Sequence, residues 1–300
     1  MKIIKLGGSL ITYKGSDAAP PYRWNETNVR YRVKEASIRE TARSITPHLE
    51  DGMVLIHGGG THGHRTVRRW AEGVVKGGEA KKIWEVKWRM LQLTETVVRL
   101  LGEEGINAVA VSPSDVMRLS GRSIRTFDDS PVREILRSGC VPVLRGDLVP
   151  DDETGGWSVV SGDEIMVELV RKGVHGSLPA ASEAIMCLDI EGFYRNLGES
   201  DQELLAEIGP DEFHASMPVW RSRITSGEEK GDVSGGVLRK VEACHRIAAM
   251  QCNAWMTGGR VKDSLKKILA GEGSGTLFRA FRGEEDCVLG KCLLSREVAE

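Results

Sequence analysis

The sequence lacks the features typical of proteins that bind nucleic acid or span a membrane. Lysine and arginine number 41 against 43 aspartates and glutamates, so the formal charge of -2 leaves none of the basic excess that binding to a phosphate backbone requires. No run approaches the roughly 20 apolar residues of a membrane span, and Gly7 and Gly8 interrupt the apolar N-terminal stretch at once. We therefore expect no nucleic-acid partner, no membrane partner and no export.

Cysteine pairs and metal-binding spacings are also missing. None of the six cysteines forms a C-x-x-C pair or stands at a zinc-finger spacing from histidine. We expect reduced, mostly buried thiols in a cytoplasmic protein, and no metal site built from side chains alone. A Walker A pattern is absent as well, which argues against a P-loop NTPase. The cysteines are Cys140, Cys187, Cys244, Cys252, Cys287 and Cys292.

What is present is an alternation of short apolar runs with longer helical patterns. This alternation predicts an α/β protein with a mostly parallel sheet, either one large unit or two lobes that share the sheet. Residues 147–156 read as a hairpin turn, residues 198–231 as irregular, and residues 173–181 as a soft lobe boundary. The expected strands are residues 2–6, 53–57, 108–112, 141–145, 157–161, 184–188 and 253–257, and the expected helices are residues 25–49, 81–102, 132–138, 163–172 and 237–250.

Four of the expected strands run directly into glycine. They lead into Gly7-Gly8-Ser9, Gly58-Gly59-Gly60, Gly162-Asp163 and Gly258-Gly259. Ligands of an open parallel sheet bind outside the carboxyl ends of its strands, and glycine lets backbone amides approach an anion closely. Each motif alone is more often a tight turn. Several such ends on one sheet edge would form a long groove for a polyanion.

Three lysines offer positive charge for such a groove. Lys5 lies inside an apolar strand, where a charged side chain is costly unless an anion meets it, although an edge-strand lysine can also reach water. Lys14 falls in the following loop, and Lys240 follows Gly236 by about one helical turn. Taken singly, each lysine is typical of a solvated surface charge.

Three histidines surround the second glycine run. His57, His62 and His64 could ligate a metal, but consecutive glycines are a poor frame for fixed coordination. His57, at a strand end, reads as structural. His64, after the loop, is placed to donate a hydrogen bond to a bound oxyanion.

Together these motifs resemble the amino acid kinase superfamily. The set comprises KLGGS with Lys14, HGGGTHGH, SGDEIMVELV, DIEGFY and GDVSGGVLRKVEA, in the order and approximate spacing of that family. With its histidine after the glycine loop, the sequence resembles the isopentenyl phosphate kinase branch of this superfamily, which also contains fosfomycin kinases. The resemblance implies an open αβα sandwich, with residues 1–178 as the lobe that binds the acceptor and residues 179–300 as the lobe that binds ATP. It also implies a homodimer that uses ATP and Mg²⁺.

The resemblance assigns roles residue by residue. It implies that Lys5, Gly7, Gly8 and Ser9 hold the ATP phosphates, that Lys14 neutralises the transferring group, and that Asp163 holds the lysines in place. The acceptor phosphate would contact Gly59, His64 and Gly162. The remaining ATP contacts would come from Gly60, Asp189, Gly236 and Lys240.

The chain departs from the family pattern around both expected substrates. Leu188 and Glu191 alter the segment that usually reads TDVDG, which bears on the base of the nucleotide. His62 replaces a phenylalanine and could make the acceptor mouth more polar. Trp84 and Trp88 lie four residues apart on one helix face, either as ordinary packing aromatics or as residues that narrow the acceptor pocket.

The function implied by the resemblance is phosphoryl transfer from ATP to a phosphate monoester, with isopentenyl phosphate as the first candidate and isopentenyl diphosphate as its product. Such a reaction mainly positions two anions and offsets their repulsion. Two alternatives stay open: a kinase of another small phosphate or phosphonate, similar to fosfomycin kinase, and a nucleotide- or oxyanion-binding module without turnover.

Overall fold

The chain folds around a seven-stranded sheet that both halves of the sequence share. The structure is a computed structural model, which describes residues 1–13, 33–63, 74–75, 79–121, 123–196, 200–225, 233–259 and 263–281. The sheet order is β14-β13-β10-β1-β2-β7-β4, and every pairing is parallel except that of β13 with β14. Its strands are β1 (Lys2–Leu6), β2 (Met53–His57), β4 (Ala108–Ala110), β7 (Val141–Arg145), β10 (Glu183–Leu188), β13 (Asn253–Gly258) and β14 (Thr276–Phe278).

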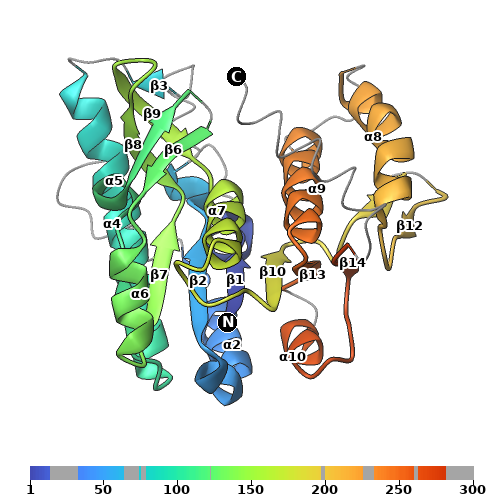
Figure 1. Ribbon diagram of the computed structural model, residues 1–300, viewed down its shortest axis with the longest axis horizontal. Helices are drawn as coiled ribbons and strands as arrows, with labels where there is room; N and C mark the ends of the chain where they lie inside the picture. Colours follow the sequence, from blue (N-terminus) through green and yellow to red (C-terminus); the bar gives the residue numbers. More distant parts are fainter. Residues whose placement is uncertain are drawn as a thin grey trace.

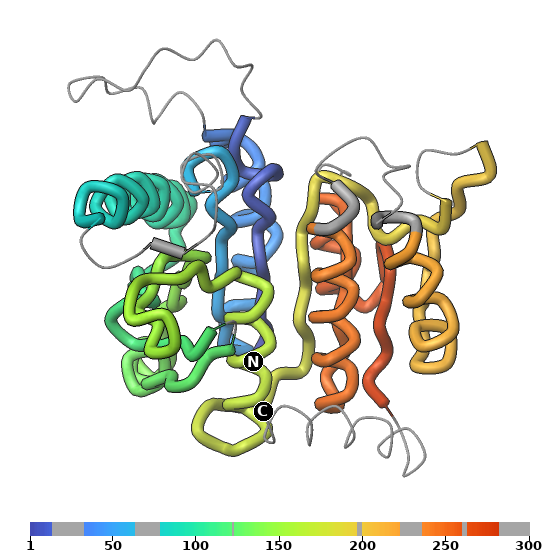
Figure 2. The backbone as a smooth tube through the Cα atoms, turned by 90° about the horizontal axis from the view of Figure 1, so that it is seen from above, coloured from blue at the N-terminus to red at the C-terminus, as the bar shows by residue number. Residues whose placement is uncertain are grey.

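The junction between the two halves of the sequence lies at the pairing of β1 with β10. Strands from the first half lie on one side of this pairing and strands from the last part of the chain on the other, as the blue-to-green and yellow-to-red halves of Figure 2 show. The expected αβα sandwich with a mostly parallel sheet is therefore confirmed. The continuous sheet gives both halves one carboxyl edge, where strand ends from each half can meet a common ligand.

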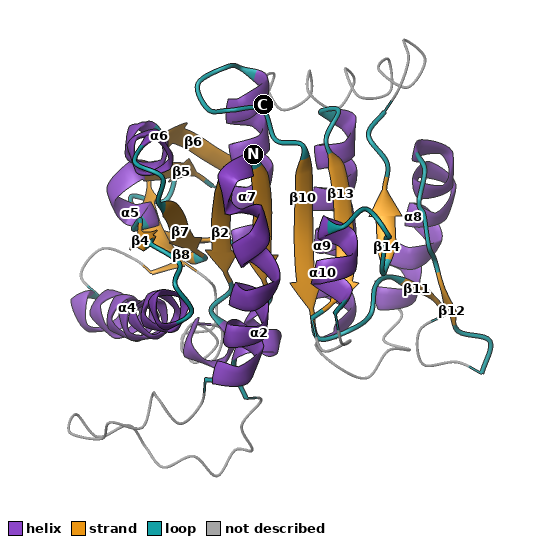
Figure 3. Cartoon of the chain, turned by 90° about the horizontal axis from the view of Figure 1, so that it is seen from below, coloured by secondary structure: helices purple, strands orange, loops and turns teal. Residues whose placement is uncertain are grey.

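Helices cover both faces of this sheet, and alternation along the strands decides which side chain meets which face. In β1, Ile3 packs in the core with helices α7 and α9, while Ile4 packs in the core with α2, α4 and α10. Figures 1 and 3 show α7 and α9 side by side along one face. Because successive strand residues point to opposite faces, Lys5 lies on the α7 side and His57 on the α4 side.

A smaller sheet extends the first half of the chain. Its order is β3-β9-β8-β5-β6, and its pairings are antiparallel except that of β5 with β8. The expected strand at residues 157–161 is β9 of this sheet and not a strand of the main sheet. The expected turn at residues 147–156 is itself half strand, because β8 pairs with β9 from Asp147 to Asp151. The bounds are β3 (Val74–Val75), β5 (Met117–Ser120), β6 (Ser123–Phe127), β8 (Asp147–Asp151) and β9 (Gly156–Val160).

The expected helices at residues 81–102, 132–138, 163–172 and 237–250 are present. Of the one expected at residues 25–49, residues 25–32 lie outside the described residues and the described helix begins at Glu35, while α1, α5, α8 and α10 were not expected. Residues 198–231, expected to be irregular, contain the helix α8 and the strand β12, which pairs with β11 (Tyr194–Arg195). The polar composition of α8 and its internal Pro218 hide the helical period. The helices are α1 (Gly8–Ile11), α2 (Glu35–Ile45), the 3-10 helix η2 (Thr46–Asp51), α4 (Ala80–Glu103), α5 (Pro113–Val116), α6 (Ser130–Arg137), α7 (Gly162–Val174), α8 (Pro210–Thr225), α9 (Val233–Ala249) and α10 (Ser264–Leu269); β12 is Glu203–Leu204.

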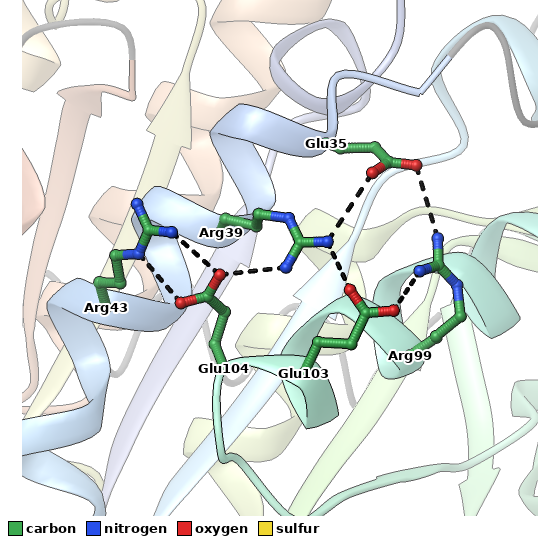
Figure 4. A network of polar contacts seen from close by, with 6 residues as sticks. All are labelled: Glu35, Arg39, Arg43, Arg99, Glu103 and Glu104. Atoms are coloured by element: carbon green, nitrogen blue, oxygen red, sulfur yellow. Dashed lines mark hydrogen bonds and ion pairs between the residues drawn. The ribbon is translucent and has the colours of Figure 1, made fainter.

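An ion-pair network fastens α2 to the last turn of α4 (Figure 4). Glu104 pairs with Arg39 at 3.1 Å and with Arg43 at 2.9 Å, and Glu103 pairs with Arg39 and Arg99. Glu35 pairs with Arg99 at 3.5 Å. Alternating charges in a connected network hold long side chains better than isolated surface pairs do. The network therefore joins the two helices that cover the face on which His57 lies.

The described residues also bear on membrane association and on the thiols. None of the described helices combines the length and apolarity needed to cross a bilayer. Cys140, Cys187, Cys244 and Cys252 are free, and all but Cys140 are buried, as predicted. Burial raises the pKa of the Cys187 and Cys252 thiols to about 12, so these two stay protonated at neutral pH. Residues 287 and 292, the other two cysteines, lie outside the described residues.

Candidate phosphate-transfer site

Two glycine loops meet at the carboxyl edge of the main sheet. One follows β1 at Gly7 and Gly8, the other follows β2 at residues 58–60, and the strands are neighbours in parallel register. A Cβ atom added to Gly8 would lie 2.2 Å from the amide nitrogen of Gly60, and one added to Gly58 would lie 2.6 Å from that of Gly8. The two backbones are thus in direct contact, which only glycine permits.

Thr12 joins the same two loops through its hydroxyl. Its Oγ1 donates to the carbonyl of Gly8 at 2.7 Å and accepts from the amide of Thr61 at 3.2 Å. Gly60 has a φ of 48°, in the left-handed region, and a Cβ there would lie 2.1 Å from Thr12 Oγ1. The turn at Gly60 therefore requires glycine both for its conformation and for its space.

A buried carboxylate forms ion pairs with two lysines next to these loops. Asp163, in the first turn of α7, lies 2.9 Å from the Lys5 ammonium and 3.6 Å from that of Lys240 in α9. Lys5 is 4% exposed, so its charge within an apolar strand is met by Asp163. A Cβ on Gly162 would lie 2.9 Å from Lys5 Cε, so glycine there leaves room for the lysine stem. The two ammonium groups and one carboxylate of this group carry one net positive charge.

The pKa values of the triad follow from its burial and its charges. Burial alone would raise the pKa of Asp163, but the Lys5 and Lys240 ammonium groups together hold it below the ordinary value. Burial lowers the pKa of Lys240, against the opposing attraction of Asp163. Asp163 is therefore ionised at neutral pH, as a counter-ion for two lysines must be.

A second link joins the turn after β1 to the end of β10. Ser9 Oγ donates to Asp189 Oδ1 at 2.8 Å, which ties α1 to the segment after β10. Lys34, which the sequence did not single out, donates from Nζ to the Ser9 carbonyl at 2.7 Å and from its backbone amide to Ile11 at the same distance. Glu191, one of the departures from the family pattern, accepts a hydrogen bond from Tyr194 at 3.0 Å.

Helix α4 closes the other side of the second glycine loop. A Cβ on Gly59 would lie 3.1 Å from the sulfur of Met90, so the loop rests on this methionine. His57 and His62 are both buried, so His62 does not present a polar surface to solvent. Trp84 and Trp88 stack on each other, with ring centroids 6.4 Å apart and planes 11° apart, and Trp88 is 39% exposed.

The structure brings together expected site residues from β1, α7 and α9, and two other expected residues lie outside the described part of the chain. Lys5, Asp163 and Lys240 form one ion-paired group, and the glycines of both loops lie in contact beside it. Gly236 lies one turn before Lys240, whose ammonium donates to the Gly236 carbonyl at 3.0 Å. Residues 14 and 64, the expected lysine and histidine, lie outside the described residues.

One prediction about the glycine ends needs correction. Three of the four glycine-ended strands, β1, β2 and β13, share the main sheet, but Gly162 follows β9 of the smaller sheet. Gly162 still reaches the same edge, because it lies against the Lys5 side chain and beside Ile56 of β2. The glycine ends that meet at this edge therefore come from strands of two sheets.

Sequence reasoning missed several polar residues that hold this edge in place. Thr12 and Lys34 contact the first loop and the turn after it, and Thr94 contacts His57 directly before the second. Arg145 bonds to Thr94, and Asp147 pairs with Arg145. The available signal was a charged pair, Arg145 and Asp147, at the end of an otherwise apolar strand, where burial demands partners.

The fold and this edge define a class of protein: an αβα sandwich in which glycine loops and paired lysines gather at the carboxyl edge of a parallel sheet, an arrangement suited to bound phosphate. The model of the amino acid kinase family matches residues 1–257. The chain belongs to this family.

Its relatives include several kinases of small molecules. The isopentenyl phosphate kinase of Methanocaldococcus jannaschii is 26% identical over 292 residues, covering 92% of this chain and 97% of its own. The isopentenyl phosphate kinase of Arabidopsis thaliana is 29% identical over 89% of each chain. The acetylglutamate kinase of Thermus thermophilus is 26% identical over 82% of this chain and 94% of its own.

Solved structures agree on the fold. An X-ray structure of isopentenyl phosphate kinase superimposes with a TM-score of 0.70 at 24% identity, covering 92% of this chain and 98% of its own. The substrate complex of an isopentenyl phosphate kinase superimposes with a TM-score of 0.67 at 21% identity, covering 93% of this chain and all of the other.

Proposed function

We propose that this protein transfers the γ-phosphoryl group of ATP to isopentenyl phosphate and forms isopentenyl diphosphate. The observation that carries the proposal is the Lys5–Asp163–Lys240 group beside two glycine loops in backbone contact. Similarity to isopentenyl phosphate kinases over about nine-tenths of the chain supports the choice of acceptor.

The chemistry needs what this edge provides. Phosphoryl transfer proceeds through a loose transition state, so the protein chiefly positions donor and acceptor and offsets their charge. A phosphate-monoester acceptor adds close to two negative charges near neutral pH, since its second pKa is about 6. Its oxygen is already ionised, so the reaction requires cations and amide donors rather than a general base.

On the donor side, we propose that ATP phosphates bind over the first glycine loop. Lys5, Gly7, Gly8 and Ser9 would hold them from the β1 side and Gly60 from the β2 side. The remaining contacts would come from the C-terminal half of the chain, residues 179–300, through Asp189, Gly236 and Lys240. The Ser9–Asp189 hydrogen bond supports this division, because it joins the strand ends of the two halves.

On the acceptor side, we propose that residues 1–178 bind the phosphate monoester. Gly59, Gly162 and His64 would contact its phosphate, and Lys14 would neutralise the group in transfer. The position of Gly162 against the Lys5 side chain supports this assignment, and Gly59 lies in the second glycine loop, which is in backbone contact with the first.

We also propose that ATP is used with Mg²⁺. Mg²⁺ is commonly held by substrate phosphates with one or two carboxylates rather than by a cage of side chains. That mode fits the described residues, among which no group of three or more histidine, cysteine, aspartate or glutamate side chains could hold a metal ion. Asp189, which follows β10 and accepts a hydrogen bond from Ser9, is the carboxylate that we propose would contact the ion, which would neutralise phosphate charge.

Two further expectations concern assembly and location. We propose a homodimer, supported by the exposed apolar residues Trp88 and Leu91 on one helix, α4. We propose a cytoplasmic location, supported by the free thiols of the described cysteines. Light scattering of the purified protein and cell fractionation test these points.

The experiment for the reaction is a coupled ADP-release assay with a panel of acceptors. We expect turnover with isopentenyl phosphate above that with dimethylallyl phosphate, fosfomycin, short alkyl phosphates, UMP or N-acetylglutamate, and isopentenyl diphosphate as the product by phosphorus NMR. Lys240→Met should lower kcat and raise the KM for ATP, while Lys266→Met, which removes an exposed lysine of α10, should change neither. If none of the acceptors in the panel gave ADP release, the proposed activity would be refuted and a binding module without turnover would be favoured.

A further inference from the structure

We propose that a polar chain, formed by the buried residues His57, Thr94, Arg145 and Asp147 and the half-buried Lys87, positions the second glycine loop for phosphoryl transfer. The inference rests on the proposed function and extends it to residues that do not belong to the glycine loops or to the paired lysines. Thr94 is the centre of the chain and acts as a positioning residue.

The chain begins with two side chains that the sheet register sets next to each other. His57 ends β2, Arg145 ends β7, and the two residues are partners in the parallel ladder. Both lie on the α4 face and both are buried. Burial, and next the Arg145 charge, lower the pKa of His57 to about 3, so the imidazole is neutral at physiological pH.

Thr94 of α4 satisfies both of these side chains. Its Oγ1 lies 2.9 Å from His57 Nε2 and accepts from Arg145 Nη1 at 3.4 Å. The same hydroxyl donates to the carbonyl of Met90 at 2.8 Å. A hydroxyl has one proton and two lone pairs, so with the proton given to Met90 it accepts from Arg145 and from the Nε2–H tautomer of His57, in which Nδ1 carries no proton. Its hydrogen-bonding capacity is then filled.

Asp147 balances the charge of Arg145 and ties it to α4 a second time. Its Oδ2 accepts from Arg145 Nε at 3.0 Å and from Lys87 Nζ at 2.7 Å, while Oδ1 accepts from the amide of Leu148 at 2.8 Å. Lys87 also donates to Ser114 Oγ at 2.8 Å. Burial lowers the pKa of Lys87, against the attraction of Asp147. The buried Arg145 is thus linked to α4 in two ways, directly through Thr94 and through Asp147, which accepts from Lys87.

The chain reaches the glycine loop at two points. His57 is the residue directly before Gly58, so its ring holds the start of the loop, and Met90, whose carbonyl Thr94 binds, lies under Gly59. A shift of the loop would also push against Gly8, because a Cβ on Gly58 would lie 2.6 Å from the Gly8 amide. One hydroxyl therefore sets both the start and the support of the loop proposed to bind acceptor phosphate.

The test replaces this hydroxyl and compares it with a matched one. Thr96, two residues on in α4, is also buried and donates to its own i−4 carbonyl, that of Gln92, at 3.0 Å. Thr94→Val removes the hydroxyl that bonds His57 and one of the two acceptors of Arg145, and we expect kcat/KM for isopentenyl phosphate to fall roughly tenfold, in line with the loss of one or two buried hydrogen bonds. The KM for ATP should stay the same. Thr94→Ser and Thr96→Val should stay within about twofold of the parent, since neither removes the shared acceptor.

Equal losses in Thr94→Val and Thr96→Val would overturn the inference, and so would a failure of Thr94→Ser to restore activity. If Thr94→Val does not fold, Thr94→Cys retains the size of the side chain with a weaker acceptor, and an intermediate loss of kcat/KM is expected. A Thr94→Cys protein with parent kinetics would count against the inference.

A second measurement separates this inference from the proposed function. Hydrogen exchange of the intact protein, followed by mass spectrometry over residues 57–63, needs no substrate. Thr94→Val should speed exchange in these residues, whereas Thr94→Ser and Thr96→Val should not. If the parent protein does not use isopentenyl phosphate, the proposed function fails while the exchange result still decides the positioning role: unchanged exchange in Thr94→Val would refute it.

Discussion

Substitution of Gly8 by alanine tests the contact between the two glycine loops most directly. The added methyl carbon would lie 2.2 Å from the amide nitrogen and 2.5 Å from the Cα of Gly60. Carbon atoms in ordinary contact are about 3.5 to 4 Å apart. Gly8 lies in the helix α1 and has no positive φ, so alanine suits its conformation and only the contact opposes it.

The magnitude follows from what can move. Both obstructing atoms belong to backbone, so no rotamer change relieves the clash, and the loops must separate by roughly 1 Å or more. A displacement of that size between reacting groups costs on the order of 100-fold in rate. Overpacking of this kind also lowers the free energy of unfolding by about 1–3 kcal/mol. We therefore expect a folded but nearly inactive Gly8→Ala protein.

The assay is kcat/KM for ATP and for isopentenyl phosphate by coupled ADP release, together with urea unfolding. Gly102→Ala is the matched control, because it also adds a methyl group to a helical glycine but has no atom within 4 Å of the new carbon. It should keep full activity and gain up to about 1 kcal/mol from helix propensity. A Gly8→Ala protein with activity within threefold of the parent and unchanged stability would refute the close contact of the loops.

Three further predictions concern charge and protonation. Asp163→Asn leaves two buried lysines without their counter-ion, so kcat should fall on the order of 100-fold and the free energy of unfolding by about 3–5 kcal/mol, measured by ADP release and urea titration. Burial is the main cause that lowers the pKa of His57 from 6.5 to about 3 and that of His245 from 6.5 to about 4. As pH falls, these histidines therefore take up protons in the unfolded chain before they do so in the folded protein. Stability should be constant above pH 6.5 and drop below it, by about 2 kcal/mol per histidine at pH 5 in urea titrations. Glu104→Gln, which weakens the bridge to Arg39, should lower the melting temperature at low salt and much less at high salt in calorimetry.

Each of these has a control and an outcome that would contradict it. Glu134 is an exposed carboxylate in α6, and Glu134→Gln should leave activity intact where Asp163→Asn does not. Equal activity of the two variants would refute the role of the Lys5–Asp163–Lys240 group in catalysis. His245→Phe should reduce the acid-dependent loss of stability, since this histidine stacks on Phe213 with ring centroids 3.6 Å apart; an unchanged slope would mean that its pKa is not lowered. A salt-independent effect of Glu104→Gln would show that packing, not charge, links α2 to α4.

Local patterns in the sequence predicted the parallel strands of the main sheet and the helices α4, α6, α7 and α9, but not most strands of the smaller sheet or the short helices α1, α5 and α10. Apolar runs bounded by glycine define β1, β2 and β7 with the bounds that the structure has, and the long three-and-four spacing defines α4 to within a residue or two. Helix α8 was missed because its polar composition and internal Pro218 obscure the period. Residues 157–161 return from a turn, as expected, but they pair with β8 and β3 in the smaller sheet, because the local pattern of a strand does not encode which sheet it joins.

What the sequence determined by itself is the set of chemical parts: glycine at strand ends, a lysine in an apolar strand that requires an anion, and the motif order of the amino acid kinase family. Only the tertiary structure decided which parts meet. Asp163 reaches Lys5 from helix α7, Gly8 touches Gly60 because β1 and β2 pair in parallel register, and Thr94 of α4 forms a hydrogen bond with His57 of the sheet. These contacts depend on packing between segments far apart in the chain, so no local preference for helix, strand or turn can reveal them.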